Sequence, residues 1–356
     1  MWNRTRITAL FGVKYPILLG PMGGGFSTPE LLAAVSNAGG LGSFGAYTLT
    51  PQEIRETDKA IRQLTDQPYN FNLWVSDVDG RLKNYPMEAL EKVKQRFKPY
   101  FDELSIPMPA LSTDIPSKFE NQVEVIFEIK PAVFSFIFGV PSPEILRECR
   151  RLNIKTVGAA TTLDEALLLE EAGVDALVAA GFEGGGHRPS FLRPPQESFT
   201  GLFALLQQLK SHIRIPIIAA GGISDGKGIA AACCLGADAV QLGTAFVACE
   251  ECNASDAHRA KLFSKEGRYT VVSKSLTGRM GRMIKNRIAD EISLDHDILP
   301  FPLHTKLLMP LKKAALEQGR TDLVNFWSGQ HKGFVHRKAD ELMTSLIKEA
   351  SMLLKI

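Results

Sequence analysis

Cysteine is scarce in this sequence, with five residues among 356. Five unevenly spaced cysteines are too few for a disulfide framework, so we predict a reducing, cytoplasmic environment. Cys249 and Cys252 form one C-x-x-C pair, but no second pair and no histidine pair follows at the spacing of a zinc site. We therefore predict that these thiols stay reduced and that the chain binds no metal.

The sequence also lacks an excess of either charge and any long apolar run. Its 41 Lys and Arg residues against 39 Asp and Glu residues leave a formal charge of +2, and the basic residues are scattered. Neither a nucleic acid nor a membrane is therefore indicated as a partner. No apolar stretch approaches the ~20 residues needed to span a bilayer. Lys14 interrupts the N-terminal apolar run, and no small-residue cleavage site follows, so we predict no signal peptide.

Short apolar runs alternate with segments of helical period through the first two-thirds of the chain. Thr28, Thr50 and Thr162 stand where helix N-caps are expected, the first two directly before a proline. Buried apolar strands separated by helices indicate a parallel sheet. Eight strands are predicted, at residues 15–22, 41–47, 69–75, 132–140, 155–160, 175–182, 215–223 and 238–246.

Eight such units in about 250 residues favour a closed (β/α)8 barrel, the TIM-barrel architecture, over an open doubly wound sheet. We predict an α/β protein with a barrel at residues 1–266 and a mainly helical C-terminal subdomain at residues 267–356. Residues 273–288 are basic and are predicted to form a loop. The G-x-G-x-x-G match at residues 40–45 follows a helix and enters a strand, so it does not indicate a dinucleotide site.

Glycines gather where four of the predicted strands end. In a barrel of this kind the carboxyl ends of the strands carry the function, and the last two strands commonly hold a phosphate. Gly221 and Gly222 follow the seventh strand, and Gly243 and Thr244 follow the eighth. Their exposed N–H groups could bind phosphate oxygens, or the glycines could simply form tight turns.

His187 follows three glycines after the sixth strand, and no lysine, cysteine or aspartate on that loop competes with it for the role of base. Its ordinary pKa near 6.5 suits proton abstraction at neutral pH. Glu183 and Arg188 flank it and are predicted to orient it, to attract an anionic substrate, or to be merely solvated. Asn72 and Gln241 lie within strands, where an amide is either structural or a donor to a heteroatom ring.

Seven motifs occur in one order along the chain: PILLGPMGGG, NFNLWV, GFEGGGH, IPIIAAGGISDG, VQLGTAF, SLTGRMGR and FWSGQ. In these the sequence resembles the nitronate monooxygenase family, formerly 2-nitropropane dioxygenases, which are FMN-dependent TIM-barrel enzymes. The resemblance implies oxidative denitrification of nitronates or nitroalkanes with O2, giving a carbonyl compound and nitrite. His187 matches the catalytic histidine, and the tryptophan of the segment 327–330 is expected to close the pocket.

The resemblance implies FMN as the cofactor. Pro21, Met22 and Gly23 would line the isoalloxazine, Asn72 would contact the ring region, Gly185 and Gly186 would lie beside the cofactor, and Gly222, Gln241, Leu242, Gly243 and Thr244 would hold the phosphate end. One departure concerns Ala180, because the family commonly has glutamine seven residues before the histidine. An amide contact to the flavin is therefore missing or supplied elsewhere.

Three other functions remain open at this point. The nearest is an FMN-dependent enoyl-acyl-carrier-protein reductase or NAD(P)H:quinone reductase. A phosphosugar isomerase or aldolase would use the same phosphate site, but it needs a lysine or carboxylate at a strand end, and Lys155 stands at the start of its strand. A flavin-binding protein without catalysis is the third. The sequence leaves the oligomeric state open, with a homodimer as one candidate.

Overall fold

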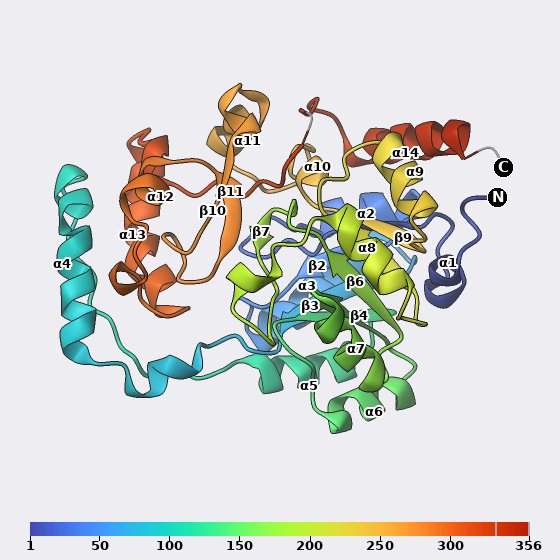
Figure 1. Ribbon diagram of the computed structural model, residues 1–356, viewed down its shortest axis with the longest axis horizontal. Coiled ribbons are helices and arrows are strands. Elements are labelled where there is room, and N and C mark those ends of the chain that lie inside the picture. The colour runs from blue at the N-terminus through green and yellow to red at the C-terminus, as the bar shows by residue number, and fades with distance from the viewer. Residues whose placement is uncertain (332, 355–356) are drawn as a thin grey trace.

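Eight parallel strands form the centre of the molecule in the computed structural model, which describes residues 1–331 and 333–354 (Figure 1). Each strand falls within one of the eight predicted segments, so that prediction is confirmed. The strands are β1 (Ile17–Leu19), β2 (Gly42–Gly45), β3 (Tyr69–Trp74), β4 (Val133–Ile137), β5 (Lys155–Ala160), β6 (Ala176–Ala180), β8 (Ile217–Ala220) and β9 (Ala239–Leu242).

The sheet closes on itself. Its hydrogen-bonded order runs β1-β9-β8-β6-β5-β4-β3-β2, and backbone hydrogen bonds of 2.9 Å and 3.0 Å join Leu41 to Leu19 and Ile17 between β2 and β1. A closed sheet leaves no edge strand open to other chains. The α/β fold with a nearly closed, TIM-like barrel is therefore confirmed.

Helices cover the outside of the barrel, and their starts follow the predicted caps. The hydroxyls of Thr28, Thr50 and Thr162 each accept a hydrogen bond from the backbone N–H three residues later, which satisfies a donor that the helix itself leaves free. The covering helices are α2 (Pro29–Asn37), α3 (Pro51–Leu64), α5 (Phe119–Ile129), α6 (Pro143–Arg151), α7 (Leu163–Glu171), α8 (Leu202–Lys210), α9 (Gly226–Cys234) and α14 (Ala339–Leu353).

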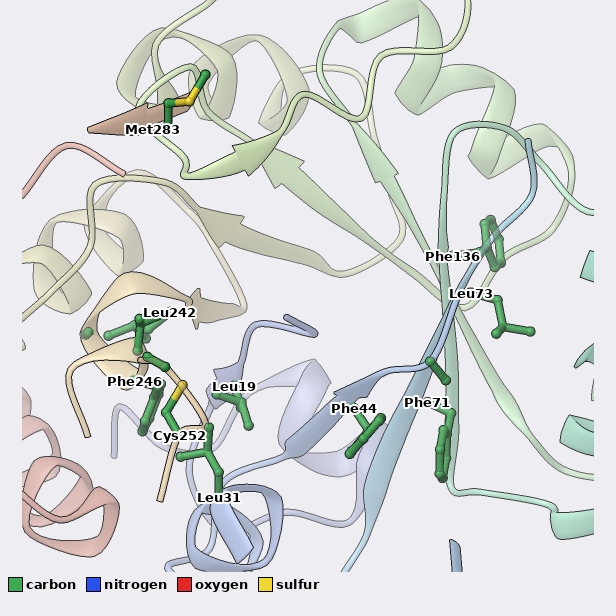
Figure 2. Packing of buried hydrophobic residues seen from close by; sticks show 14 of the residues in the cluster. Leu19, Leu31, Phe44, Phe71, Leu73, Phe136, Leu242, Phe246, Cys252 and Met283 are labelled. Carbon is green, nitrogen blue, oxygen red and sulfur yellow. The ribbon is translucent and has the colours of Figure 1, made fainter. Parts of the chain in front are cut away.

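The hydrophobic core lies mainly between strands and helices. Figure 2 shows part of it, where Leu19, Leu31 and Phe246 gather near β1 and Phe44 and Phe71 lie on the neighbouring strands. The remaining helical elements are α1 (Arg6–Phe11), α4 (Met87–Glu103), α10 (Thr244–Val247), α11 (Asp256–Phe263), α12 (Arg287–Glu291) and α13 (Leu303–Glu317), with short 3-10 turns at Gly80–Asn84, Pro195–Ser198, Glu266–Arg268, Asp295–Asp297 and Thr321–Leu323.

The prediction of a loop at residues 273–288 is wrong in part. This stretch contains β11 (Gly281–Ile284) and the start of α12. Strand β11 lies between β10 (Thr270–Ser273) and β7 (Gly186–His187) in a small antiparallel sheet. The strand was not predicted because its basic residues suggested a solvent-exposed loop. Arg282 donates two hydrogen bonds, of 3.0 Å and 3.1 Å, to the carbonyl of Phe182, so its charge is held inside the fold.

The C-terminal elements lie in two places. Helices α12 and α13 lie beside α4, away from the barrel, whereas α14 lies next to α9 and α2 on its outer surface (Figure 1). The last helix thus takes the position of the eighth barrel helix. The division into a barrel of residues 1–266 and a subdomain of residues 267–356 stays a prediction.

Candidate active site

A cavity opens at the carboxyl ends of the barrel strands. Residues from the ends of all eight strands line it, among them Gly20 after β1, Trp74 on β3 and Ala180 on β6. Nearly all of the site residues predicted from the sequence lie on this one cavity: Pro21, Met22, Gly23, Asn72, Gly185, Gly186, His187, Gly221, Gly222, Gln241, Gly243 and Thr244.

Leu242 is the exception. Its side chain is buried in the core rather than in the cavity wall, and its carbonyl accepts a 2.7 Å hydrogen bond from the N–H of Gly20. Alternation along β9 explains the difference, because neighbouring side chains on a strand point to opposite faces. Gln241 therefore faces the cavity, where its amide makes no hydrogen bond to any described residue.

Bare backbone forms much of the cavity wall. A Cβ on Gly185 would lie 2.4 Å from the backbone nitrogen of Gly329, so only glycine permits the close contact between these two loops. A Cβ on Gly243 would meet no atom within 4 Å and would extend into open space. The N–H groups of Gly222 and Gly243 form no hydrogen bond within the described chain. Unpaired donors beside open space are what an anionic group such as phosphate needs.

His187 lies on β7, where it pairs with Gly281 of β11. Its Nε2 is 2.9 Å from Oγ1 of Thr277, within hydrogen-bond distance. Burial lowers the pKa of His187 to about 3, with smaller contributions from the positive charges of Arg279 and Lys312. The imidazole is therefore neutral at physiological pH.

Aromatic rings surround the imidazole. The ring of Trp74 lies edge-on to it with centroids 5.2 Å apart, and the ring of Trp327 lies 4.8 Å away. Tyr47 stacks on Trp74 with a centroid distance of 3.6 Å. These three rings line the cavity, and together they make the surroundings of the histidine largely apolar.

Asn72 is buried on β3, with 2 % of its surface exposed. Its amide nitrogen donates a 3.0 Å hydrogen bond to the hydroxyl of Ser135, which also accepts a bond from Asn70. One side of the Asn72 amide is therefore fixed by the protein. No described residue occupies its oxygen, and the side chain lines the cavity.

Neither residue that flanks the catalytic candidate is simply solvated. Both carboxylate oxygens of Glu183 accept hydrogen bonds from the N–H of Leu202, at 3.0 Å and 2.9 Å, and so cap the start of α8. The buried Arg188 guanidinium donates to the carbonyls of Ala180, at 2.5 Å, and of Ser198. Burial lowers the pKa of Arg188 to about 10.

Sequence reasoning missed several residues of the site. Thr277, Arg279 and Arg282 belong to the SLTGRMGR motif, to which the sequence assigned no role. Arg282 lines the cavity, and the Arg279 guanidinium lies over the rings of Phe138 and Phe301, at 4.2 Å and 4.6 Å from their centroids. The only signal was the motif itself, because these contacts depend on the position of β11.

The thiols of the C-x-x-C pair are both hydrogen-bonded to backbone carbonyls. The Cys249 thiol donates to the carbonyl of Ala245 at 3.7 Å, and the Cys252 thiol to that of Phe26 at 3.3 Å. Burial raises their pKa values to about 12 and about 11, so both stay protonated and unreactive.

Within residues 1–331 and 333–354, no helix is long and apolar enough to cross a membrane.

Comparison with known proteins agrees with this geometry. The family model described as nitronate monooxygenase matches residues 4–349. A protein of Staphylococcus aureus (strain Newman) named "Probable nitronate monooxygenase" is 35% identical over 358 residues, covering 100% of this chain and 99% of the relative.

Two solved structures extend the comparison to the fold. Nitroalkane oxidase from Streptomyces ansochromogenes matches with a TM-score of 0.88 and 32% identity, over 98% of each chain. FabK from Thermotoga maritima matches with a TM-score of 0.75 and 28% identity, over 99% of this chain and 97% of the other.

Proposed function

The chain belongs to the nitronate monooxygenase family of oxidoreductases, and from this we propose that it uses FMN and O2 to convert nitronates or nitroalkanes to a carbonyl compound and nitrite. One observation carries the proposal: His187 lines the same cavity as the glycine loops that follow β6, β8 and β9. The proposed base and the loops proposed to bind the cofactor therefore share one rim of the barrel, which supports the proposal.

The residues present fit FMN. Gly222 and Gly243 offer free N–H groups for the phosphate, and the space beside Gly243 is open. Pro21, Met22 and Gly23 follow β1 on the cavity wall, where their backbone would lie along the isoalloxazine, and Asn72 supplies an amide oxygen toward it. When bound, FMN would accept electrons from the substrate and pass them to O2.

In the proposed reaction His187 acts as the base that receives the α-proton of the substrate. Its imidazole is neutral at physiological pH, so a lone pair is available for the α-proton of a nitroalkane. The apolar rings around it disfavour the imidazolium, but a nitronate anion formed beside it would offset part of that cost. A preformed nitronate needs no such proton transfer, and we expect it to react faster than the neutral nitroalkane.

Absorption spectroscopy and nitrite release test the proposal. The purified protein should show the visible bands of a flavin, and propionate 3-nitronate in air should give nitrite at a rate that follows protein concentration. A colourless protein that stays colourless with added FMN would contradict the cofactor assignment.

The same assay separates the alternative predicted from the sequence. An enoyl-acyl-carrier-protein reductase or a quinone reductase would consume NADPH with the matching acceptor and release no nitrite. The cytoplasmic location and the homodimer stay predictions.

A further inference from the structure

We infer that Thr277 is a positioning residue for His187: its hydroxyl accepts the Nε2–H of the imidazole, so that Nδ1 is the nitrogen left to take a proton. The inference rests on the proposed function only in treating His187 as the base. The choice of tautomer itself follows from hydrogen bonds of the protein.

The hydroxyl of Thr277 has a single proton and lies within hydrogen-bond distance of two groups that could take it. Oγ1 of Thr277 donates a 3.1 Å hydrogen bond to the carbonyl of Arg279. Oγ1 is also 2.9 Å from Nε2 of His187. A carbonyl can only accept a hydrogen bond, whereas Nε2 can either donate or accept one. Both contacts are satisfied together when the hydroxyl proton goes to the carbonyl and Nε2 carries the hydrogen.

The other ring nitrogen is free. Nδ1 of His187 makes no hydrogen bond to any residue of the described chain, and the ring lines the cavity. A neutral imidazole has one N–H and one lone pair. If Nε2 holds the hydrogen, the lone pair is on Nδ1.

Helix α13 fixes the segment that carries Thr277. Three consecutive carbonyls of this segment each accept one hydrogen bond from a side chain of α13. His304 donates to Ser275 at 2.8 Å, Lys312 to Leu276 at 2.7 Å, and Thr305 to Thr277 at 3.1 Å. A hydroxyl on a segment held at every peptide unit has little freedom to leave the imidazole.

The backbone of the histidine is tied to the same strand connection. Gly281 of β11 pairs with His187, and the N–H of Arg188 donates a 2.8 Å hydrogen bond to the carbonyl of Met280. The turn from Thr277 to Gly281 therefore sets both the main chain of the histidine and the partner of its ring. One hairpin controls the position and the tautomer together.

Nitrogen NMR of protein labelled with 15N in its histidine rings tests the inference on the flavin-loaded protein. The His187 signals are identified by their loss in His187→Asn. The wild-type protein should show a protonated Nε2 and an unprotonated Nδ1 between pH 6 and 8. A protonated Nδ1 would overturn the inference, whatever the variants do.

Two substitutions at position 277 separate the hydroxyl from the shape of the side chain. Thr277→Val keeps the volume and removes the hydroxyl, so an Nε2–H would lose its acceptor and the Nδ1–H tautomer should become the major one. We expect kcat/KM for a neutral nitroalkane to fall about tenfold, since a net hydrogen bond of ordinary strength fixes the tautomer. Oxidation of a preformed nitronate should change less than twofold. Thr277→Ser keeps the hydroxyl and should restore the wild-type tautomer and rate.

Thr305→Val is the matched control for the NMR measurement. It removes a hydroxyl bonded to the same segment but leaves Oγ1 of Thr277 in place, so the wild-type tautomer should persist. Equal tautomer ratios in wild type and Thr277→Val would contradict the inference. A wild-type protein that gives no nitrite from any nitronate would instead refute the proposed function and leave the NMR result to decide the tautomer.

Discussion

Two histidines, His187 on the cavity wall and the buried His304, contact the same three-residue segment and have similar aromatic neighbours. His187 bonds the hydroxyl of Thr277, and His304 bonds the carbonyl of Ser275. Each imidazole meets an aromatic ring edge-on with centroids 5.2 Å apart, Trp74 for the first and Phe97 for the second. Burial lowers their pKa values to about 3 and about 4.

Their second nitrogens differ. Nδ1 of His304 accepts a 3.2 Å hydrogen bond from the N–H of Leu299, so both of its ring nitrogens are satisfied. His187 has a partner at Nε2 alone, and its ring lines the cavity. A strongly shifted pKa therefore does not distinguish the proposed base from a histidine whose two nitrogens are both bonded within the protein. The nitrogen that the protein leaves free does.

The largest expected effect is the loss of activity when His187 is substituted. His187→Asn should lower kcat/KM for neutral nitroalkanes by about 10²–10⁴-fold, the usual contribution of a general base. Flavin content and the denaturation midpoint should stay close to wild type, because the cradle glycines are untouched. Steady-state nitrite assays measure kcat/KM, the flavin absorbance measures the flavin content, and urea denaturation gives the midpoint. Full activity on a neutral nitroalkane would remove His187 from the role of base.

The opposite result is expected for the second histidine. His304→Ala would leave the N–H of Leu299 and the carbonyl of Ser275 unpaired and would open a cavity at a side chain with 0 % exposure. The free energy of unfolding should fall by about 2–4 kcal/mol, measured by urea denaturation. His296→Ala, at a residue whose side chain is 62% exposed, is the control and should change little. Unchanged stability in His304→Ala would contradict the conclusion that His304 stabilises the fold.

Local features made the barrel predictable from the sequence. The strands are short apolar runs, and the helices begin at threonine caps such as Thr50, whose partner Glu53 is only three residues away. The cluster of glycines at the strand ends also placed the cavity, since parallel strands of a closed barrel end at one rim. The position of His187 on this cavity could be predicted for the same reason, because it lies on a loop directly after a strand.

Long-range contacts could not be predicted in this way. Thr277 is 90 residues from His187 in the sequence. Arg282 donates to the carbonyl of Phe182, which lies 100 residues earlier in the chain. The strand that brings them together was concealed by its own basic residues, whose charges suggested a solvated loop. The bond from the Arg188 guanidinium to the carbonyl of Ala180 is short-range, but it too gave no sequence signal, because any residue supplies a carbonyl.

The smallest expected effect is a dependence of stability on acid. The folded-state pKa of His304 is about 4 and its unfolded value is near 6.5, so below pH 6.5 the unfolded chain takes up a proton that the folded chain refuses. Stability is therefore lost as the pH falls, by about 1 kcal/mol for this histidine between pH 6.5 and 5.5. Carboxylates contribute little in that window, because their ordinary pKa values are near 4.

Urea denaturation at pH 6.5 and 5.5 measures this loss in wild type and in His304→Ala. The variant should lose about 1 kcal/mol less than wild type over the interval, since one titrating group is gone. His187→Asn should reduce the loss by a similar amount, because the folded-state pKa of His187, about 3, also lies well below this interval. An unchanged loss in His187→Asn would contradict the lowered pKa of His187 and would show that its free nitrogen, which faces the cavity, is hydrated when it takes a proton, whereas both nitrogens of His304 are bonded to the protein.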